Sequence, residues 1–131
     1  LNKKFVIRGN GESIRDYIYI DDIVEVYKLL SEKLYINPRK YSGEIFNAGT
    51  NIPHKTKEIL KKIFLYKGKV KEFKKITKSM KKNKTSGELS IQYMDYKKLY
   101  DHFGWKPKGK FNSTLPKIYN WYKSYFKKQG K

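Results

Sequence analysis

Apolar side chains recur at intervals of three or four residues in four stretches of the chain, which is the spacing of one face of an α-helix. The first stretch starts after Asp22, which is suited to cap a helix with Glu25 three positions on, and it ends before Pro38. We therefore expect a first helix over residues 22–37. Its apolar stripe consists of Ile23, Val26, Tyr27, Leu30 and Leu34.

Three further helices are predicted by the same spacing. One covers residues 56–67 and ends at a glycine, and another covers residues 95–103 and also ends at a glycine. The last is capped by Asn112 or Ser113 and carries Pro116 in its first turn.

Short extended runs alternate with these helices. Gly9-Asn10-Gly11 predicts a turn, and the alternation over residues 17–20 is typical of a short strand. Residues 44–49 predict a short buried strand, residues 70–76 predict another, and the lysine-rich residues 78–90 predict a surface loop. The order indicates the α/β class, with about four helices and three or four short strands that belong to a larger sheet.

The composition narrows the class of protein. The chain has 131 residues, which suits one domain, and its 12 Tyr, 7 Phe and 2 Trp supply a packed core that a disordered basic tail would lack. It has no Cys, which excludes a disulfide scaffold, a Cys-ligated metal and a thiol nucleophile. No run of 18 apolar residues predicts a membrane span and no signal peptide opens the chain, so we expect a cytoplasmic protein with no membrane partner.

The formal net charge of +19 has two interpretations. Lys, Asn, Ile and Tyr make up nearly half of the chain and have AT-rich codons, so genome composition accounts for an excess that is almost entirely Lys. The alternative is selection for a nucleic acid or another polyanion. Lysines fill the polar face of every predicted helix, which favours the first interpretation. Under either, anionic ligands are attracted, and the attraction weakens with salt.

Four blocks distributed along the chain carry a recognisable motif pattern. They are residues 9–22 (GNGESIRDYIYIDD), residues 43–49 (GEIFNAG), residues 95–107 (DYKKLYDHFGWKP) and the pair Trp121-Tyr122. In this order they resemble the extended short-chain dehydrogenases, the NAD-dependent nucleotide-sugar epimerases and 4,6-dehydratases. Residues 91–95 look most like the CDP-glucose 4,6-dehydratase branch.

The resemblance covers the C-terminal, substrate-binding portion of such a Rossmann-type enzyme, which we assign to residues 1–126, with a basic frayed tail over residues 127–131. It implies that the N-terminal dinucleotide-binding half, which would hold NAD, is absent, since the chain has no G-x-x-G-x-x-G. Tyr93 and Lys97 have the spacing of the family's Tyr-x-x-x-Lys pair but fall in another block, so we interpret them as coincidence. We expect no catalytic residue and no turnover from this chain alone.

Arg15 is the strongest candidate for a substrate ligand. The resemblance implies that it contacts the diphosphate of the nucleotide sugar, and a guanidinium fork suits phosphate oxygens. It is also one of three Arg in a chain that otherwise uses Lys. The alternative is a surface Arg paired with Asp16 or another neighbour.

Three further candidates have weaker support. The resemblance suggests substrate contacts for Asn47 and Thr56, whose alternatives are a local backbone bond and a helix cap. The family often has an Arg in the loop before residue 95, but this loop has none, and Lys84 or Lys82 would replace it only as a point charge.

Other polar residues have structural interpretations. Asp16, Asp21 and Asp22 are close enough in sequence to suggest a metal site, but a helix N-terminus explains them better, and no metal is expected. His54 and His102 are isolated histidines with no expected catalytic role.

Three hypotheses for function remain. In the first, the chain is the nucleotide-sugar-binding part of a 4,6-dehydratase or an epimerase. The second is a basic module that binds nucleic acid or another polyanion, and the third is a remnant or split subunit that docks on a separate Rossmann chain. Family members often dimerise through helices that this chain lacks, so a homodimer is expected of the parent enzyme only.

Overall fold

The computed structural model of the chain describes residues 9–80 and 89–130. The chain divides into two compact units. The first unit consists of Leu1–Arg15, Pro53–Gln92 and Asn120–Lys131, and the second of Asp16–Ile52 and Tyr93–Tyr119. Within the described ranges, no helix combines the length and the apolar character needed to cross a membrane.

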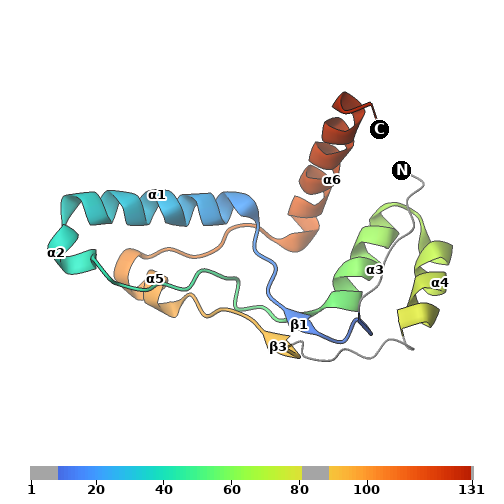
Figure 1. Cartoon of the computed structure of the whole chain (residues 1–131), viewed down its shortest axis with the longest axis horizontal. Coiled ribbons are helices and arrows are strands. Elements are labelled where there is room, and N and C mark those ends of the chain that lie inside the picture. The colour runs from blue at the N-terminus through green and yellow to red at the C-terminus, as the bar shows by residue number, and fades with distance from the viewer. Residues whose placement is uncertain (1–8, 81–88, 131) are drawn as a thin grey trace. The chain divides into compact units, whose positions relative to one another are not determined.

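A small three-stranded sheet organises the first unit (Figure 1). Its strands are β1 (Ile14–Arg15), β2 (His54–Lys55) and β3 (Ile91–Gln92), and β1 lies in the middle. β2 runs antiparallel to β1 and β3 runs parallel to it. The turn expected before the first strand is present, because Gly11 has a φ of +77° and the Asn10 side chain accepts the Glu12 N–H.

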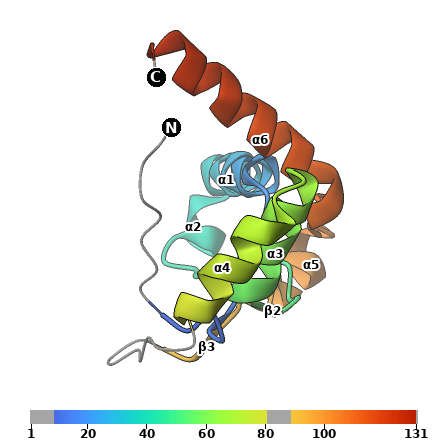
Figure 2. The ribbon, with the colours of Figure 1, turned by 90° about the vertical axis from the view of Figure 1, so that its right-hand side faces the viewer.

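Two helices pack together in the same unit, α3 (Thr56–Tyr66) and α4 (Val70–Met80), as Figure 2 shows. The ring centroids of Phe64 and Phe73 lie 6.0 Å apart between them. The helix expected from residue 56 is confirmed, whereas the strand expected over residues 70–76 is wrong. The apolar residues of α4 follow one another at helical intervals of three and four, and this stripe packs toward α3.

The second unit contains α1 (Ile20–Ile36), the short α2 (Pro38–Tyr41), α5 (Lys97–Phe103) and the first part of α6 (Phe111–Lys128). Its core is formed by Val26 of α1, Leu99 of α5 and Trp105, with half-buried apolar side chains packed against them. Trp105 is thus the buried anchor that a Trp between Gly104 and Pro107 suggests. The described residues form six helices and one three-stranded sheet, which agrees with the α/β class.

The start of α1 differs from the expectation. The helix begins at Ile20 with Tyr19 as its N-cap, so Asp22 does not cap it. Asp22 is buried, and its carboxylate accepts the backbone N–H groups of Lys108 and Gly109 at 3.1 and 2.9 Å. Asp22 therefore ties α1 to the segment before α6. Such a contact between distant parts of the chain cannot be predicted from the local sequence pattern.

Two expected strands are absent from the described residues. Residues 17–20 precede and begin α1, and the strand of this region lies earlier, at Ile14–Arg15. Residues 44–49 form no strand, although Phe46 and Ala48 pack against the core. A strand needs a neighbour to satisfy its backbone groups, and no described segment pairs with residues 44–49.

The ends of α5 and α6 refine the expected boundaries. Gly104 ends α5 in the left-handed conformation with a φ of +67°, as expected. Tyr96 is the N-cap of α5, while Asp95 accepts the Lys97 N–H from one position earlier. α6 begins at Phe111, so Pro116 lies inside it rather than in its first turn.

Candidate functional site

The sheet of the first unit arranges three side chains in a row. Arg15, the last residue of β1, pairs with His54 of β2 and with Gln92 of β3. Residues directly opposite each other on neighbouring strands project from the same face of a sheet. The register therefore sets His54, Arg15 and Gln92 side by side on one face, which we call the Arg15 row.

Arg15 is held at this position from both sides, because it belongs to the central strand. Its side chain is half-buried, and its guanidinium donates to the backbone oxygen of Ile14 at 2.8 Å. A planar cationic fork can bond two oxygens of one phosphate group. A cation on a paired strand is also positioned more firmly than one on a loop.

Thr56 is bonded to the strand that carries Arg15. It is the first residue of α3, directly after β2, and both its backbone N–H and its hydroxyl donate to the Ser13 oxygen, at 2.9 and 3.0 Å. The N-cap of α3 is Lys55, so Thr56 does not hold the capping position that was its alternative interpretation. Two of the four candidate ligands, Arg15 and Thr56, thus belong to the same unit and to paired segments.

An exposed acidic and basic cluster lies beside the paired strands β1 and β2. Glu12 bonds to Lys55 at 3.0 Å and also to Lys57. The hydrogen bonds from Lys57 and then Lys55 hold the pKa of the Glu12 carboxyl below its usual value, and the bond to Glu12 raises the pKa of Lys55. Glu12 therefore already compensates the charge of these two lysines.

The other two candidate ligands do not belong to the described part of the first unit. Asn47 is exposed and belongs to the second unit. Lys84, together with Lys82, lies outside the described residues.

His54 and Gln92 are the neighbours of Arg15 that sequence reasoning missed. The sequence pattern predicts only an isolated histidine at residue 54 and no role for Gln92. Each belongs to a strand of two residues, too short to leave a periodic pattern, so only the pairing register identifies them. Their neutral forms offer hydrogen bonds beside the charge of Arg15.

The carboxylates considered for a metal take part in separate protein bonds. Asp16 accepts hydrogen bonds from Thr50, Asn51 and Met94, and Asp22 accepts them from the segment before α6. In the ranges that the structure describes, no three His, Cys, Asp or Glu side chains gather as a metal-binding group would require.

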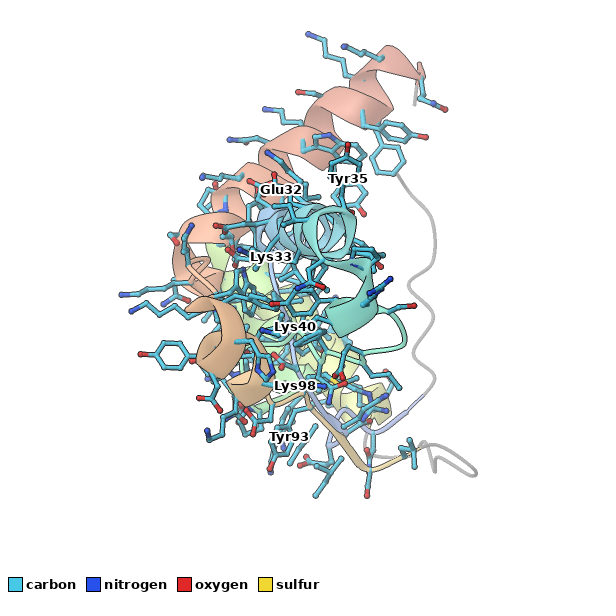
Figure 3. All side chains as sticks on the ribbon, turned by 90° about the vertical axis from the view of Figure 1, so that its left-hand side faces the viewer. Glu32, Lys33, Tyr35, Lys40, Tyr93 and Lys98 are labelled. Carbon is cyan, nitrogen blue, oxygen red and sulfur yellow. The ribbon has the colours of Figure 1, made fainter. Side chains whose placement is uncertain are left out.

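Lysines gather around an aromatic cluster in the second unit. The Phe103 ring centroid lies 5.6 Å from that of Tyr41 and 5.4 Å from that of Phe46. The Lys33, Lys40 and Lys98 ammonium groups lie 6.0, 5.2 and 4.6 Å from the centroids of Phe103, Tyr41 and Phe46, respectively. Lys33 belongs to α1, Lys40 to α2 and Lys98 to α5, and all three are labelled in Figure 3.

The lysine cluster also contains structural contacts. Lys98 bonds to the Glu44 carboxylate at 2.5 Å and to the Ile45 oxygen at 3.0 Å. His102 has Nδ1 3.0 Å from the Lys98 oxygen and its ring edge-on to Phe46. Lys98 and His102 therefore fasten residues 44–46 to α5.

Comparisons with known proteins place these features in a family context. The family model described as GDP-mannose 4,6 dehydratase matches residues 1–118. The dTDP-D-glucose 4,6-dehydratase of Dictyostelium discoideum is 37% identical over 62 residues, which cover 47% of this chain and 13% of that protein.

Two bacterial relatives match along nearly the whole chain. The dTDP-glucose 4,6-dehydratase of Haemophilus influenzae is 27% identical, over 93% of this chain and 36% of its own length. The CDP-paratose 2-epimerase of Salmonella typhi is 25% identical, over 92% of this chain and 33% of its own length. The chain thus spans about a third of the length of these two relatives. No solved structure was found to match it.

Proposed function

Because the chain belongs to the GDP-mannose 4,6 dehydratase family, we propose that it is the nucleotide-sugar-binding part of an NAD-dependent sugar-nucleotide 4,6-dehydratase or epimerase. The observation that carries this proposal is the Arg15 row, in which a guanidinium lies on the central strand between two polar neighbours. In the proposed complex, Arg15 bonds the diphosphate oxygens through its fork of donors.

The residues near Arg15 have complementary roles in this proposal. Thr56, whose hydroxyl and backbone N–H bond to Ser13, locks α3 to β1 beside the arginine. His54 and Gln92 supply donors and acceptors at either side of the charge. Lys84 remains a proposed contact of the distal phosphate, and Asn47 remains a proposed substrate contact.

NAD does not fit the residues that the structure describes. A dinucleotide site needs a glycine-rich turn between a strand and a helix, so that the backbone can approach the pyrophosphate. The segments that join β1 to α1, β2 to α3 and β3 to α5 contain no glycine. We therefore propose that NAD is bound by another part of the enzyme, and that this chain contributes substrate binding and no turnover of its own.

The proposal is tested by titrating the purified chain with dTDP-, CDP-, UDP- and GDP-sugars in a calorimeter. At least one should bind, and Arg15→Ala should weaken that binding by about tenfold or more, because hydrogen bonds to charged groups contribute about 1.5–3 kcal/mol. Arg15→Lys should lie between the two, since a lysine keeps the charge without the fork.

Arg39→Ala is the matched control, because it removes the same charge from an exposed position on α2. If Arg39→Ala weakens binding as much as Arg15→Ala, the affinity depends only on the net charge of the chain, and the assignment of Arg15 as the binding residue is wrong. Turnover of a nucleotide sugar by the purified chain with NAD would contradict the proposal that this chain binds substrate but has no activity of its own.

A polyanion-binding role is the second candidate function, and the lysine cluster of α1, α2 and α5 favours it (Figure 3). Its test is the salt dependence of binding to a random DNA duplex. A steep slope that Lys33→Gln and Lys40→Gln reduce together would support it. A slope that these variants leave unchanged would assign the attraction to the overall charge of +19.

A further inference from the structure

The Asp16 carboxylate is a meeting point of segments far apart in the sequence. Its Oδ2 atom accepts the backbone N–H groups of Thr50, Asn51 and Met94 at 2.8, 3.3 and 3.4 Å, and its Oδ1 atom accepts the Thr50 hydroxyl. All of these residues belong to the second unit. One side chain therefore fastens two backbone segments that lie 34 and 78 residues further along the chain.

The surrounding backbone is shaped around this carboxylate. Gly49 is buried, and a Cβ there would lie 2.6 Å from the Met94 Cβ and 2.9 Å from the Met94 oxygen, and would collide with Asp16 Oδ2. Asn51 adopts a left-handed φ of +55°, and the Thr50 hydroxyl accepts the Ile52 N–H at 3.2 Å. Asn tolerates the left-handed conformation better than most non-glycine residues, and the Asp16 bonds to the Thr50 and Asn51 N–H groups hold the turn in place.

The tied segments are those that enter and leave the sheet. Asp16 is joined by a peptide bond to Arg15, the last residue of β1, and Met94 follows β3 with one residue between. Residues 50–52 lead through Pro53 into β2. Because β3 is parallel to β1 and β2 is antiparallel, all three connections leave the same end of the sheet, the end that carries the Arg15 row.

From this connectivity we infer that Asp16 is the positioning residue of the substrate-binding arginine. It acts through the chain: its bonds fix the residues next to β1, β2 and β3, and so fix the register that places His54 and Gln92 beside Arg15. The inference rests on the proposed function of Arg15. It means that Asp16, although negatively charged, supports the binding of a negatively charged ligand.

The sign of the effect makes the inference testable. Asp16 carries a negative charge next to a proposed phosphate ligand, so by charge alone its removal should strengthen the binding of an anion. If Asp16 positions Arg15, Asp16→Ala should instead weaken the binding of dTDP-glucose and of inorganic pyrophosphate by about tenfold or more, because small misplacements of binding groups are costly.

Three further variants separate the effect of the Asp16 hydrogen bonds from the effect of its charge. Asp21→Ala is the control, because it removes the same charge from an exposed position in α1, and it should leave affinity unchanged or slightly higher. Gly49→Ala keeps every charge but forces the Asp16 carboxylate and Met94 apart, so it should weaken binding as Asp16→Ala does. Asp16→Asn retains one acceptor oxygen and should restore part of the affinity.

A second readout needs no ligand. The chain has three arginines, so the Arg15 side-chain N–H resonance can be assigned by NMR, and amide exchange can be followed at Ile14 and Arg15. Asp16→Ala should broaden or shift the Arg15 signal and speed exchange at both amides, whereas Asp21→Ala should not. This readout decides the inference even if the wild-type chain binds neither probe, an outcome that overturns the proposed function alone.

The inference is overturned if Asp16→Ala leaves Arg15 exchange and the Arg15 side-chain signal as they are in Asp21→Ala. It is also overturned if wild-type binding depends on Arg15 while Asp16→Ala binds pyrophosphate as tightly as wild type or more tightly. Circular dichroism of each variant establishes that the helices are retained.

Discussion

Leu99 shows at the scale of one residue how the second unit is held together. Its side chain has no exposed surface and contacts the core formed with Val26 and Trp105. Leu99→Ala should lower the free energy of unfolding by about 2–5 kcal/mol, through lost burial and the cavity that remains. Leu34→Ala is the control, since 45% of Leu34 is exposed, and it should change stability by less than about 1 kcal/mol in urea denaturation.

The pair formed by Glu44 and Lys98 predicts a pH dependence. The hydrogen bond and the charge of Lys98 hold the pKa of the Glu44 carboxyl below its ordinary value of 4.5. The bond therefore adds stability above pH 4.5, and this contribution is lost as the pH falls through the lower folded value. An NMR titration of Glu44 should show the depressed pKa in the wild type and a return toward 4.5 in Lys98→Met.

The matched variant for this titration is Lys28→Met, which removes an exposed lysine of α1. It should leave the Glu44 midpoint where the wild type has it. Equal movement in both variants would assign the shift to the general positive charge of the chain rather than to Lys98.

At the scale of elements, the end of α5 isolates a backbone effect. Gly104 has a φ of +67°, and a Cβ placed there would meet nothing within 4 Å. Gly104→Ala should therefore lower stability by about 1–2 kcal/mol from the left-handed conformation alone. Gly104→Asn should cost less, because Asn tolerates that conformation better, and thermal unfolding of the two variants gives the comparison. Equal losses would mean that side-chain contacts, and not φ, set the cost.

Among the helices, some were correctly predicted from the sequence and one was not. α1, α3 and α5 have strong local signals, namely apolar stripes and a terminal glycine, and they were predicted with small errors at their ends. α4 was wrongly predicted as a strand, although Val70, Phe73, Ile76 and Met80 recur at the intervals of three and four that are typical of a helix.

The site was predictable only in part, for a physical reason. Arg15 could be chosen from chemistry and resemblance, and Thr56 from resemblance. His54, Gln92 and the bonds of Asp16 depend on contacts between distant segments, and two-residue strands leave no periodic trace of such pairing. The prediction that Asp22 caps α1 was wrong for the same reason, since its hydrogen-bond partners lie 86 and 87 residues away in the sequence.

α1 also has an exposed apolar stripe, and Tyr27 belongs to it rather than to the core-facing stripe in which the sequence places it. Ile20, Val24 and Tyr27 recur at intervals of four and three and are 62%, 50% and 71% exposed. The buried side of the same helix is marked by Val26. An amphipathic helix with two apolar stripes is typical of an element that also contacts a partner surface, which agrees with the proposed assembly with a dinucleotide-binding part.

At the scale of the whole molecule, the charge of +19 should make stability depend on salt. Self-repulsion among many lysines destabilises the folded chain, and salt screens it. The melting temperature should therefore rise between about 20 and 200 mM NaCl.

A variant with the four exposed lysines of α4 changed to Gln (Lys71, Lys74, Lys75 and Lys78) should show a smaller rise, because like charges at helical spacing repel. A melting temperature that falls with salt in both proteins would show instead that the ion pairs, such as Lys108 with Glu25, outweigh the repulsion.

The shortness of the three strands also bears on how the molecule folds. β1 pairs with segments that lie much later in the chain, so the sheet closes long loops for very few backbone bonds. Helices form from local contacts, and non-local pairing of this kind is slow. We therefore expect the Arg15 row to be assembled late, after the helices, and the anion binding proposed for that row to appear only near the end of folding.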